Sequence, residues 1–447
     1  MSVLNVEKEL TRARLLPSNN IKNAEARLTS ITLAVFQSIP EFAQRMLNTV
    51  GVRVGQRSSV RSYIEPELNR NRKTNKSEDR PDGLIVHQNG KNLWLAVIEA
   101  KINNAEIKAD QVKRYIQLAT ASALPIDAII TISNQFVAVP SHHPLKSLLD
   151  KRRKIKLYHW SWTNIETQAV LLLEDPDFEQ REKRYILREF IHFLQSESSG
   201  VTKFNSMHKD WAEMIKQART EGVKIPKNEI TENAVGSWHQ ECRDIVLMLA
   251  RELKQPVTLQ LRRDHINDPS KRLDDDIKLL IEKSTLVANI NVHHAASDIC
   301  ITANVQSKVV TLSMDLKAPQ DIPTYKGRIG WLTRQLKDQH DKPIDIYIYG
   351  KRKTQMLCER LSEILDKDNH DFWGEAKKLE PSRFEVKWQA DFSKEFSQSR
   401  GFIVKLEELM LMFYKSVGEN LQQYQPAPPR IKKADAELKS EEDLTEE

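Results

Sequence analysis

A nearly continuous apolar segment at residues 92–100 (NLWLAVIEA) limits the possible folds more than any other feature of the chain. A strand with apolar side chains on both faces must be covered on both sides, as in the centre of a sheet flanked by helices. The segment follows Asn89-Gly90, the strongest two-residue signal for a β-hairpin turn. We therefore predict that residues 82–88 and 92–100 form an antiparallel pair inside a sheet.

Helical and strand-like segments alternate around this hairpin. Residues 21–48 have a helical apolar period, which Ile39-Pro40 breaks or bends. The other elements expected are strands at 59–67, 127–133 and 155–162 and helices at 105–122, 163–173 and 177–195. Because a crossover helix follows the hairpin, we predict an α/β fold with a mixed sheet flanked by helices.

The second half of the chain is expected to form a separate α/β or α+β domain. Its expected helices are at 207–221, 237–254, 325–338, 354–367 and 401–418, and its expected strands at 257–263, 277–282, 286–293, 298–305, 308–317, 344–350 and 384–392. Residues 196–204 (SESSGVTKF) are typical of a linker. We therefore place the domains at 1–198 and 205–420, followed by a disordered, Pro-rich and then acidic tail at 421–447.

Positive charge is concentrated in the first part of the chain. The net charge of +6 over 447 residues is small, but residues 1–160 hold 25 Lys and Arg against 14 Asp and Glu, which gives +11. The other 287 residues carry 43 basic and 48 acidic side chains, which gives −5. A basic domain favours a polyanionic partner such as nucleic acid. A solvated basic surface explains the same count equally well.

Cysteine usage and hydropathy indicate a cytoplasmic protein. Cys242, Cys300 and Cys358 are too few and too scattered for a disulfide framework or a zinc site. Aliphatic runs such as 169–173 are far shorter than the ~20 apolar residues that span a bilayer. The first ten residues lack the apolar core of a secretory signal. We expect no membrane partner, while a homo-oligomer or a protein partner stays open.

Three charged side chains are expected at one end of the predicted hairpin. Glu99 and Lys101 are two positions apart and share one face of their strand, and Asp82 begins the partner strand. Charges at the end of a buried strand are costly unless they are paired or hold a metal ion. Two carboxylates and a backbone carbonyl suit Mg²⁺ or Mn²⁺.

Pro81-Asp82 followed by Glu99-Ala100-Lys101 resembles the motif of the PD-(D/E)xK nuclease superfamily, over roughly residues 20–165. The predicted order helix, three strands, helix, strand matches the α-β-β-β-α-β core of its restriction-endonuclease-like fold. Gln111 and Tyr115 match the Gln-x-x-x-Tyr element of RecB-like members, where these residues support the active site. The resemblance implies metal-dependent phosphodiester hydrolysis, with Asp82 and Glu99 as metal ligands and Lys101 as the catalytic cation.

Members of this superfamily also often carry an acidic metal ligand on the first helix. Glu25 is the best candidate here, and Glu65 and Glu67 are alternatives. The resemblance does not distinguish DNA from RNA. We expect DNA as the substrate more than RNA, and a role in defence against foreign DNA or in DNA repair. Two other interpretations stay open: a catalytically inactive nuclease-like module that binds nucleic acid or assembles with a partner, and a surface hairpin with an ordinary Glu99–Lys101 salt bridge.

Basic residues flank the candidate motif. We expect phosphate contacts from the loop before Asp82 and from the helix that carries Gln111. The residues are Arg72, Lys73, Lys76, Arg80, Lys113 and Arg114. Solvated loop charge is the alternative explanation.

A similar spacing recurs in the second half of the chain. The spacing between Asp298 and Asp315 equals that between Asp82 and Glu99, and Lys317 follows Asp315 by two residues, as Lys101 follows Glu99. Chance is the simpler explanation, but a diverged copy of the first fold would give the same pattern. The second domain is otherwise expected to recognise a target or a partner.

Overall fold

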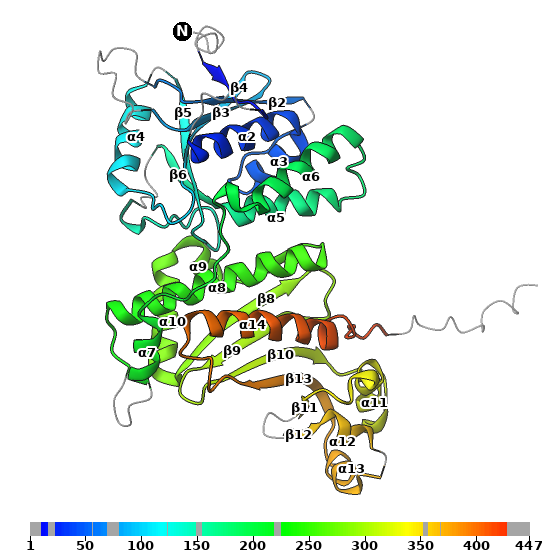
Figure 1. The fold of residues 1–447 in the computed structure, drawn as a ribbon. Helices are drawn as coiled ribbons and strands as arrows, with labels where there is room; N and C mark the ends of the chain where they lie inside the picture. The colour runs from blue at the N-terminus through cyan, green and yellow to red at the C-terminus, as the bar shows by residue number, and fades with distance from the viewer. Residues whose placement is uncertain are drawn as a thin grey trace, which may run out of the picture. The chain divides into compact units, whose positions relative to one another are not determined.

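The computed structural model describes residues 10–16, 23–55, 57–68, 80–122, 124–148, 154–218, 225–351, 356–366 and 368–426 (Figure 1). It divides into two compact units, one of Met1–Ser313 with Gln389–Lys415 and the other of Met314–Trp388 with Ser416–Glu447. The expected boundary between residues 198 and 205 stays a prediction. Residues 427–447, most of the expected tail, lie outside the described residues.

The first sheet is mixed, as expected from the hairpin and the crossover helix. Its strands follow one another in the order of the sequence. They are β1 (Thr11–Arg12), β2 (Ser58–Ile64), β3 (Gly83–Asn89), β4 (Asn92–Ala100), β5 (Ile126–Ser133) and β6 (Lys156–Ser161). The pairs from β1 to β4 are antiparallel, whereas β4–β5 and β5–β6 are parallel. The predicted hairpin is β3–β4, with Gly90 at a φ of 60° in its turn.

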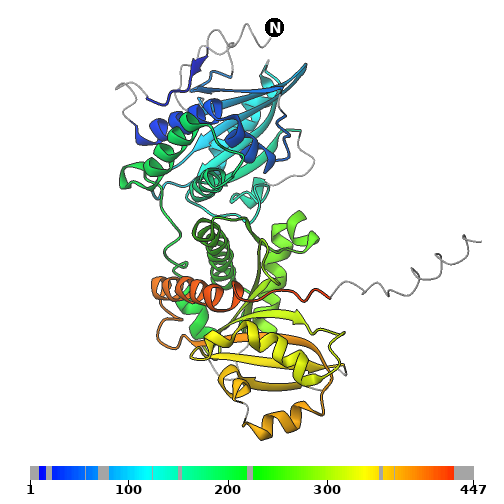
Figure 2. The same ribbon diagram turned by 90° about the vertical axis from the view of Figure 1, so that its right-hand side faces the viewer.

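Helices cover both faces of this sheet (Figures 1 and 2). They are α2 (Ala24–Ser38), α3 (Pro40–Asn48), α4 (Ala109–Ala121), α5 (Trp162–Leu173) and α6 (Arg181–Gln195), followed by the 3₁₀ turn Glu197–Ser199. Alternate residues of β4 belong to two cores: Ile98 packs with α2, α3, α5 and α6, and Val97 packs with α4. The predicted break is found, because Ile39 ends α2 and Pro40 begins α3.

The second sheet has seven strands in the order β12-β11-β13-β10-β9-β8-β7. The strands are β7 (Val257–Leu259), β8 (Thr285–Val292), β9 (Ile299–Asn304), β10 (Val309–Lys317), β11 (Ile344–Gly350), β12 (Met356–Arg360) and β13 (Pro381–Asp391). Every pairing that the structure records here between described strands is antiparallel. This second sheet therefore differs from the first sheet, which is mixed.

The remaining helices accompany the second sheet. They are α7 (Trp211–Ala218), α8 (Glu229–Leu253), α9 (Arg263–Asn267), α10 (Pro269–Lys283), α11 (Tyr325–Gln335), α12 (Leu361–Leu365), α13 (His370–Ala376) and α14 (Ser399–Phe413), with a 3₁₀ turn at Lys337–Gln339 and a π-helical segment at Tyr414–Gly418. A further 3₁₀ turn, Lys146–Leu148, lies between β5 and β6 of the first sheet. Among the described residues, no helix is long and apolar enough to cross a membrane.

Two expected elements of the second half are wrong. Residues 277–282 belong to helix α10, not to a strand, because the Asp268 carboxylate accepts the backbone N–H groups of Ser270 and Lys271 and Pro269 begins the helix. The expected helix at 354–367 contains strand β12 and the short helix α12 instead. Pairing with β11 decides the conformation of β12, since Cys358 lies opposite Tyr347 in the ladder.

Candidate active site

Asp82 lies directly before β3, at the end of the hairpin opposite the turn. Its Oδ2 accepts the backbone N–H of Ala100 at 2.7 Å, which places the carboxylate beside the last residues of β4. The hairpin register sets this position, because Gly83 lies opposite Ile98. Local strand pairing thus brings Asp82 next to Glu99 and Lys101.

The ammonium of Lys101 joins two carboxylates. Its Nζ donates to Glu99 Oε1 at 2.6 Å and to Glu25 Oε1 at 2.9 Å. It also donates to the Ala100 carbonyl oxygen at 2.7 Å. Glu99 is only 1% exposed, whereas Glu25 and Lys101 are partly accessible. The three charges therefore form a cluster that solvent reaches from one side.

Helix α2 supplies the third acid. The Asn23 side chain caps the helix by accepting the Glu25 backbone N–H, and this holds Glu25 in the first turn. The two alternatives from the sequence do not join the cluster. Glu65 is exposed, and Glu67 is exposed and forms an ion pair with Arg80.

Helix α4 contributes the two residues expected from the Gln-x-x-x-Tyr pattern. Gln111 Nε2 donates to Glu99 Oε1 at 2.7 Å and contacts the Tyr115 hydroxyl at 3.0 Å. The Tyr115 hydroxyl in turn donates to the Arg80 carbonyl oxygen at 3.4 Å. The pair thus links α4, the end of β4 and the residue before Pro81.

Two hydrogen bonds to the backbone groups of Lys101 fix this residue where the chain leaves the sheet. Its N–H donates to Ile132 O at 2.8 Å, and its carbonyl oxygen accepts the Trp162 indole N–H at 2.8 Å. Trp162 is fully buried at the start of α5. The sequence-based predictions missed this contact, because nothing local connects Trp162 to Lys101.

The site raises the proton affinity of the Asp82 and Glu99 carboxylates. Burial, reinforced by the negative charge of Glu99, raises the pKa of Asp82 to about 7. Burial also raises the pKa of Glu99, against the opposing effect of Lys101. For Lys101, burial would lower the pKa, but the carboxylates of Glu99, Asp82 and Glu25 outweigh it and raise it above its ordinary value.

One carboxylate oxygen of the candidate site is suited to binding a hard cation such as Mg²⁺. Glu99 Oε2 is buried and has no hydrogen-bond partner among the described residues, which is uncommon for a carboxylate oxygen and suits a metal ligand. The oxygens of Glu25, Asp82 and Glu99 do not all lie within 4.8 Å of one another. Since Lys101 lies between Glu25 and Glu99, cation binding would require its ammonium to move away from one of them.

The predicted phosphate contacts are only partly described. Arg72, Lys73 and Lys76 lie outside the described residues. Arg80 is exposed beside Glu67, and Lys113 is exposed beside Asp110 at 3.5 Å. Arg114 is half-buried on α4. Nucleic-acid contact by these residues stays a prediction.

Asp298 and Asp315, the possible echo of the first motif, have separate partners. Asp298 accepts a hydrogen bond from Asn291 at 2.8 Å, whereas Asp315 forms an ion pair with Arg383 at 3.1 Å. No metal-ligand group among the described residues includes either aspartate.

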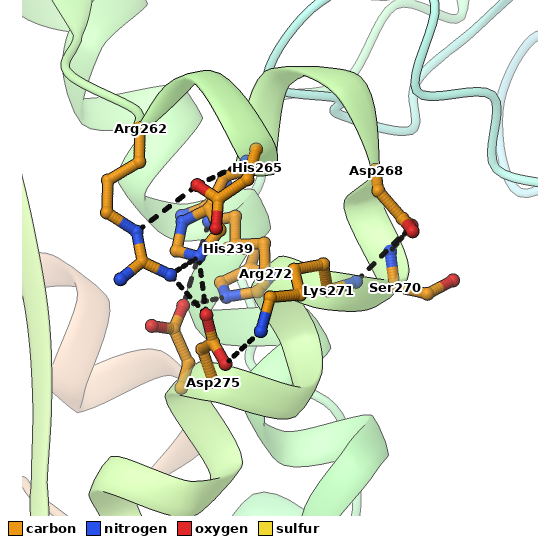
Figure 3. Close-up of polar contacts among 10 residues, drawn as sticks. His239, Arg262, His265, Asp268, Ser270, Lys271, Arg272 and Asp275 are labelled. Carbon is orange, nitrogen blue, oxygen red and sulfur yellow. Dashed lines mark hydrogen bonds and ion pairs between the residues drawn. The ribbon is translucent and has the colours of Figure 1, made fainter.

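A second polar cluster, absent from the sequence-based predictions, lies at α9 and α10 (Figure 3). Asp264, His265 and Asp275 bring potential ligand atoms within 4.8 Å of one another. Arg262 and Lys271 both pair with Asp275, and Arg262 also pairs with Asp264. The cluster is therefore an ion-pair network already neutralised by its own cations.

Two buried histidines brace the sheet beside the candidate site. Thr131, which lies opposite Glu99 in the β4–β5 ladder, contacts His143 Nε2 at 2.7 Å and His159 Nδ1 at 2.8 Å. His143 Nδ1 accepts the Leu145 backbone N–H, and His159 Nε2 lies 3.1 Å from the Gln135 carbonyl oxygen. Every bond is satisfied when both imidazoles are neutral, with His143 donating to Thr131 and Thr131 donating to His159.

We expect this network to make the protein acid-sensitive. Burial, together with the neighbouring His159, lowers the pKa of His143 to about 3, and burial lowers the pKa of His159 to about 4. The unfolded chain takes up these protons near pH 6.5, so the free energy of unfolding should fall as the pH drops from about 6.5 to about 4. Urea unfolding across this range checks the prediction. An equal slope in His159→Asn would contradict it.

Comparison of the chain with protein-family models, curated proteins and solved structures finds no match.

Proposed function

We propose that this protein is a metal-dependent nuclease of the PD-(D/E)xK type that hydrolyses phosphodiester bonds in DNA, with a restriction-endonuclease-like fold in the expected first domain, residues 1–198. The observation that carries the proposal is the meeting of Asp82, Glu99 and Lys101 with Glu25 at the end of β4. The order α2, β2, β3, β4, α4, β5 supports the fold assignment, and the contacts of Gln111 with Glu99 and Tyr115 support the RecB-like variant.

Asp82, Glu99 and the Ala100 carbonyl oxygen would hold Mg²⁺ or Mn²⁺, with Glu25 as an outer acid. A bound ion of this kind lowers the pKa of water and neutralises charge on a phosphoryl oxygen. Gln111 holds the Glu99 carboxylate in place. Lys101 is charged in this environment, and once it releases Glu25 it can stabilise the negative charge that develops on the phosphate.

The test is a cleavage assay on duplex DNA, single-stranded DNA and RNA, with and without Mg²⁺ or Mn²⁺. We expect metal-dependent cleavage of DNA by the unaltered protein and none by Asp82→Ala. If the metal-loaded protein cleaves none of these substrates, the proposal fails. Salt-sensitive but metal-independent binding would then support the non-catalytic module, in which Lys101 serves only to pair Glu25 and Glu99.

Metal affinity should depend on pH through Asp82. Since the pKa of Asp82 is raised to about 7, a proton competes with the cation below this pH. We expect the apparent Mn²⁺ affinity, measured by calorimetry, to weaken up to about tenfold per pH unit as the pH falls below 7. Asp82→Asn should bind Mn²⁺ weakly and with a smaller pH dependence, because only Glu99 then exchanges a proton for the cation. A pH-independent affinity in the unaltered protein would argue against Asp82 as a ligand.

A further inference from the structure

Helix α8 buries an unusual row of polar side chains. Trp238, Glu241 and Asp244 follow one another at three-residue intervals, which places them along one side of the helix. Their exposed fractions are 0%, 0% and 1%. Four polar atoms of this row have no hydrogen-bond partner among the described residues: Trp238 Nε1, Glu241 Oε1, Glu241 Oε2 and Asp244 Oδ1. Because nearly all buried polar groups in proteins are paired, this row needs an explanation.

The charges around Glu241 make an ionised carboxylate unfavourable there. Its charged neighbours are Asp244 on the same helix and Glu407 on α14, and the Cys242 thiol is also close. The nearby cations are directed at the other two acids, since Lys203 and Arg251 both act on Asp244 and Glu407. Asp244 additionally accepts the Phe204 backbone N–H. Among the described residues, the charged groups that act on Glu241 are thus two carboxylates, and its own carboxylate oxygens have no hydrogen-bond partner.

Burial and these two carboxylates raise the pKa of Glu241 well above its ordinary value. Burial also raises the pKa of Asp244 to about 7, with Arg251 opposing the shift. A carboxyl group in such surroundings avoids most of the cost of burial by holding a proton. A metal ion explains the row less well, because no three ligand atoms there lie within 4.8 Å of one another.

The cluster lies where several segments of the first unit join. Trp238 packs on Phe402 of α14 with ring centroids 6.3 Å apart. Arg251 donates to Thr167 of α5 at 2.9 Å, and Arg243, which interacts electrostatically with Asp244, donates to Asn164 of α5 at 3.0 Å. A negative charge appearing on Glu241 would therefore act on the contacts of α8 with α14, with α5 and with residues 203–204.

We propose that Glu241 is a proton-binding site whose neutral acid form allows α8 to pack against α14 and residues 203–204, so that this packing loosens when Glu241 loses its proton. This proton-binding site is independent of the proposed nuclease activity. It would make the stability of this packing respond to alkaline conditions, in contrast to the histidine network, which responds to acid.

The direction of the pH effect follows from linkage. The folded protein keeps a proton on Glu241 that the unfolded chain releases above about pH 4.5, so the free energy of unfolding falls as the pH rises from about 4.5 toward the folded-state pKa. Glu241→Gln keeps the shape of the side chain without its charge. We expect this variant to unfold at a higher temperature than the unaltered protein at pH 8, and to release about one proton fewer on unfolding.

The experiment is thermal and urea unfolding of the full chain between about pH 5 and pH 9. Glu408→Gln, an exposed substitution next to Glu407 on α14, is the matched control and should leave the curve unchanged. Hydrogen exchange at both ends of the range should show loss of protection in α8 and α14 at high pH, and less loss in Glu241→Gln. An unchanged pH dependence in Glu241→Gln would overturn the proposal.

Infrared spectroscopy keeps the proposal testable if Glu241→Gln does not fold. The unaltered protein at neutral pH should show the carbonyl absorption of a protonated carboxyl group, and a variant that combines Asp82→Asn, Glu99→Gln and Asp244→Asn should retain it, because these replacements remove three other carboxyl groups with raised pKa values. If this absorption is missing at neutral pH, Glu241 is ionised and the proposal is wrong.

Discussion

Lys101→Met is expected to reduce metal-dependent cleavage by about 10²–10³-fold, the usual loss when one preorganised charge-stabilising donor is removed. The reason is geometric, because the Lys101 ammonium lies 2.6 Å from Glu99 Oε1 and 2.9 Å from Glu25 Oε1. Methionine keeps an unbranched apolar side chain and loses the charge. Single-turnover cleavage at saturating Mg²⁺ measures the effect, and nucleic-acid binding should change little.

The control for Lys101→Met is the same substitution at another lysine of the β3–β4 hairpin. Lys91→Met removes an exposed ammonium from the turn of the β3–β4 hairpin, at the end opposite Lys101, and it should leave the cleavage rate near its original value. The double variant Glu99→Gln/Lys101→Met removes both charges of the buried pair and should recover stability without recovering cleavage. Full activity in Lys101→Met would exclude Lys101 as the catalytic cation.

Trp162→Ala should lower the free energy of unfolding by about 3–5 kcal/mol, because it removes a fully buried indole from the core formed with α2, α3, α5 and α6. Trp162→Phe is more informative. It keeps most of the ring but leaves the Lys101 carbonyl oxygen without its 2.8 Å hydrogen bond, which should cost about 1–3 kcal/mol. Urea unfolding measures both losses.

Trp162→Phe should also slow cleavage without changing KM, since the indole acts by positioning Lys101. Trp160→Phe is a closely matched control, because Trp160 is equally buried and its indole N–H donates to Thr49 at 3.0 Å, away from Lys101. We expect a similar loss of stability in Trp160→Phe with an unchanged cleavage rate. If the two variants affect cleavage equally, Trp162 has only a structural role.

The first sheet was largely predictable because its signals are local. Asn89-Gly90 marks a turn, and the apolar segment 92–100 requires cover on both faces. One of the two errors missed a local signal, and in the other a strand pairing overrode local preference. Residues 277–282 carry apolar side chains that suit a strand or a helix, and the N-cap at Asp268 stabilises the helix. In β12, pairing with β11 decides for the strand.

For the candidate site, the sequence by itself determined the residues that one hairpin brings together. Asp82, Glu99 and Lys101 meet because strand register and side-chain alternation follow from short-range order. The choice of Glu25 over Glu65 and Glu67 required the packing of α2 on the sheet. Trp162, Thr131 and Glu241 became visible only in the tertiary structure, since burial and long-range hydrogen bonds depend on residues that are distant in the chain.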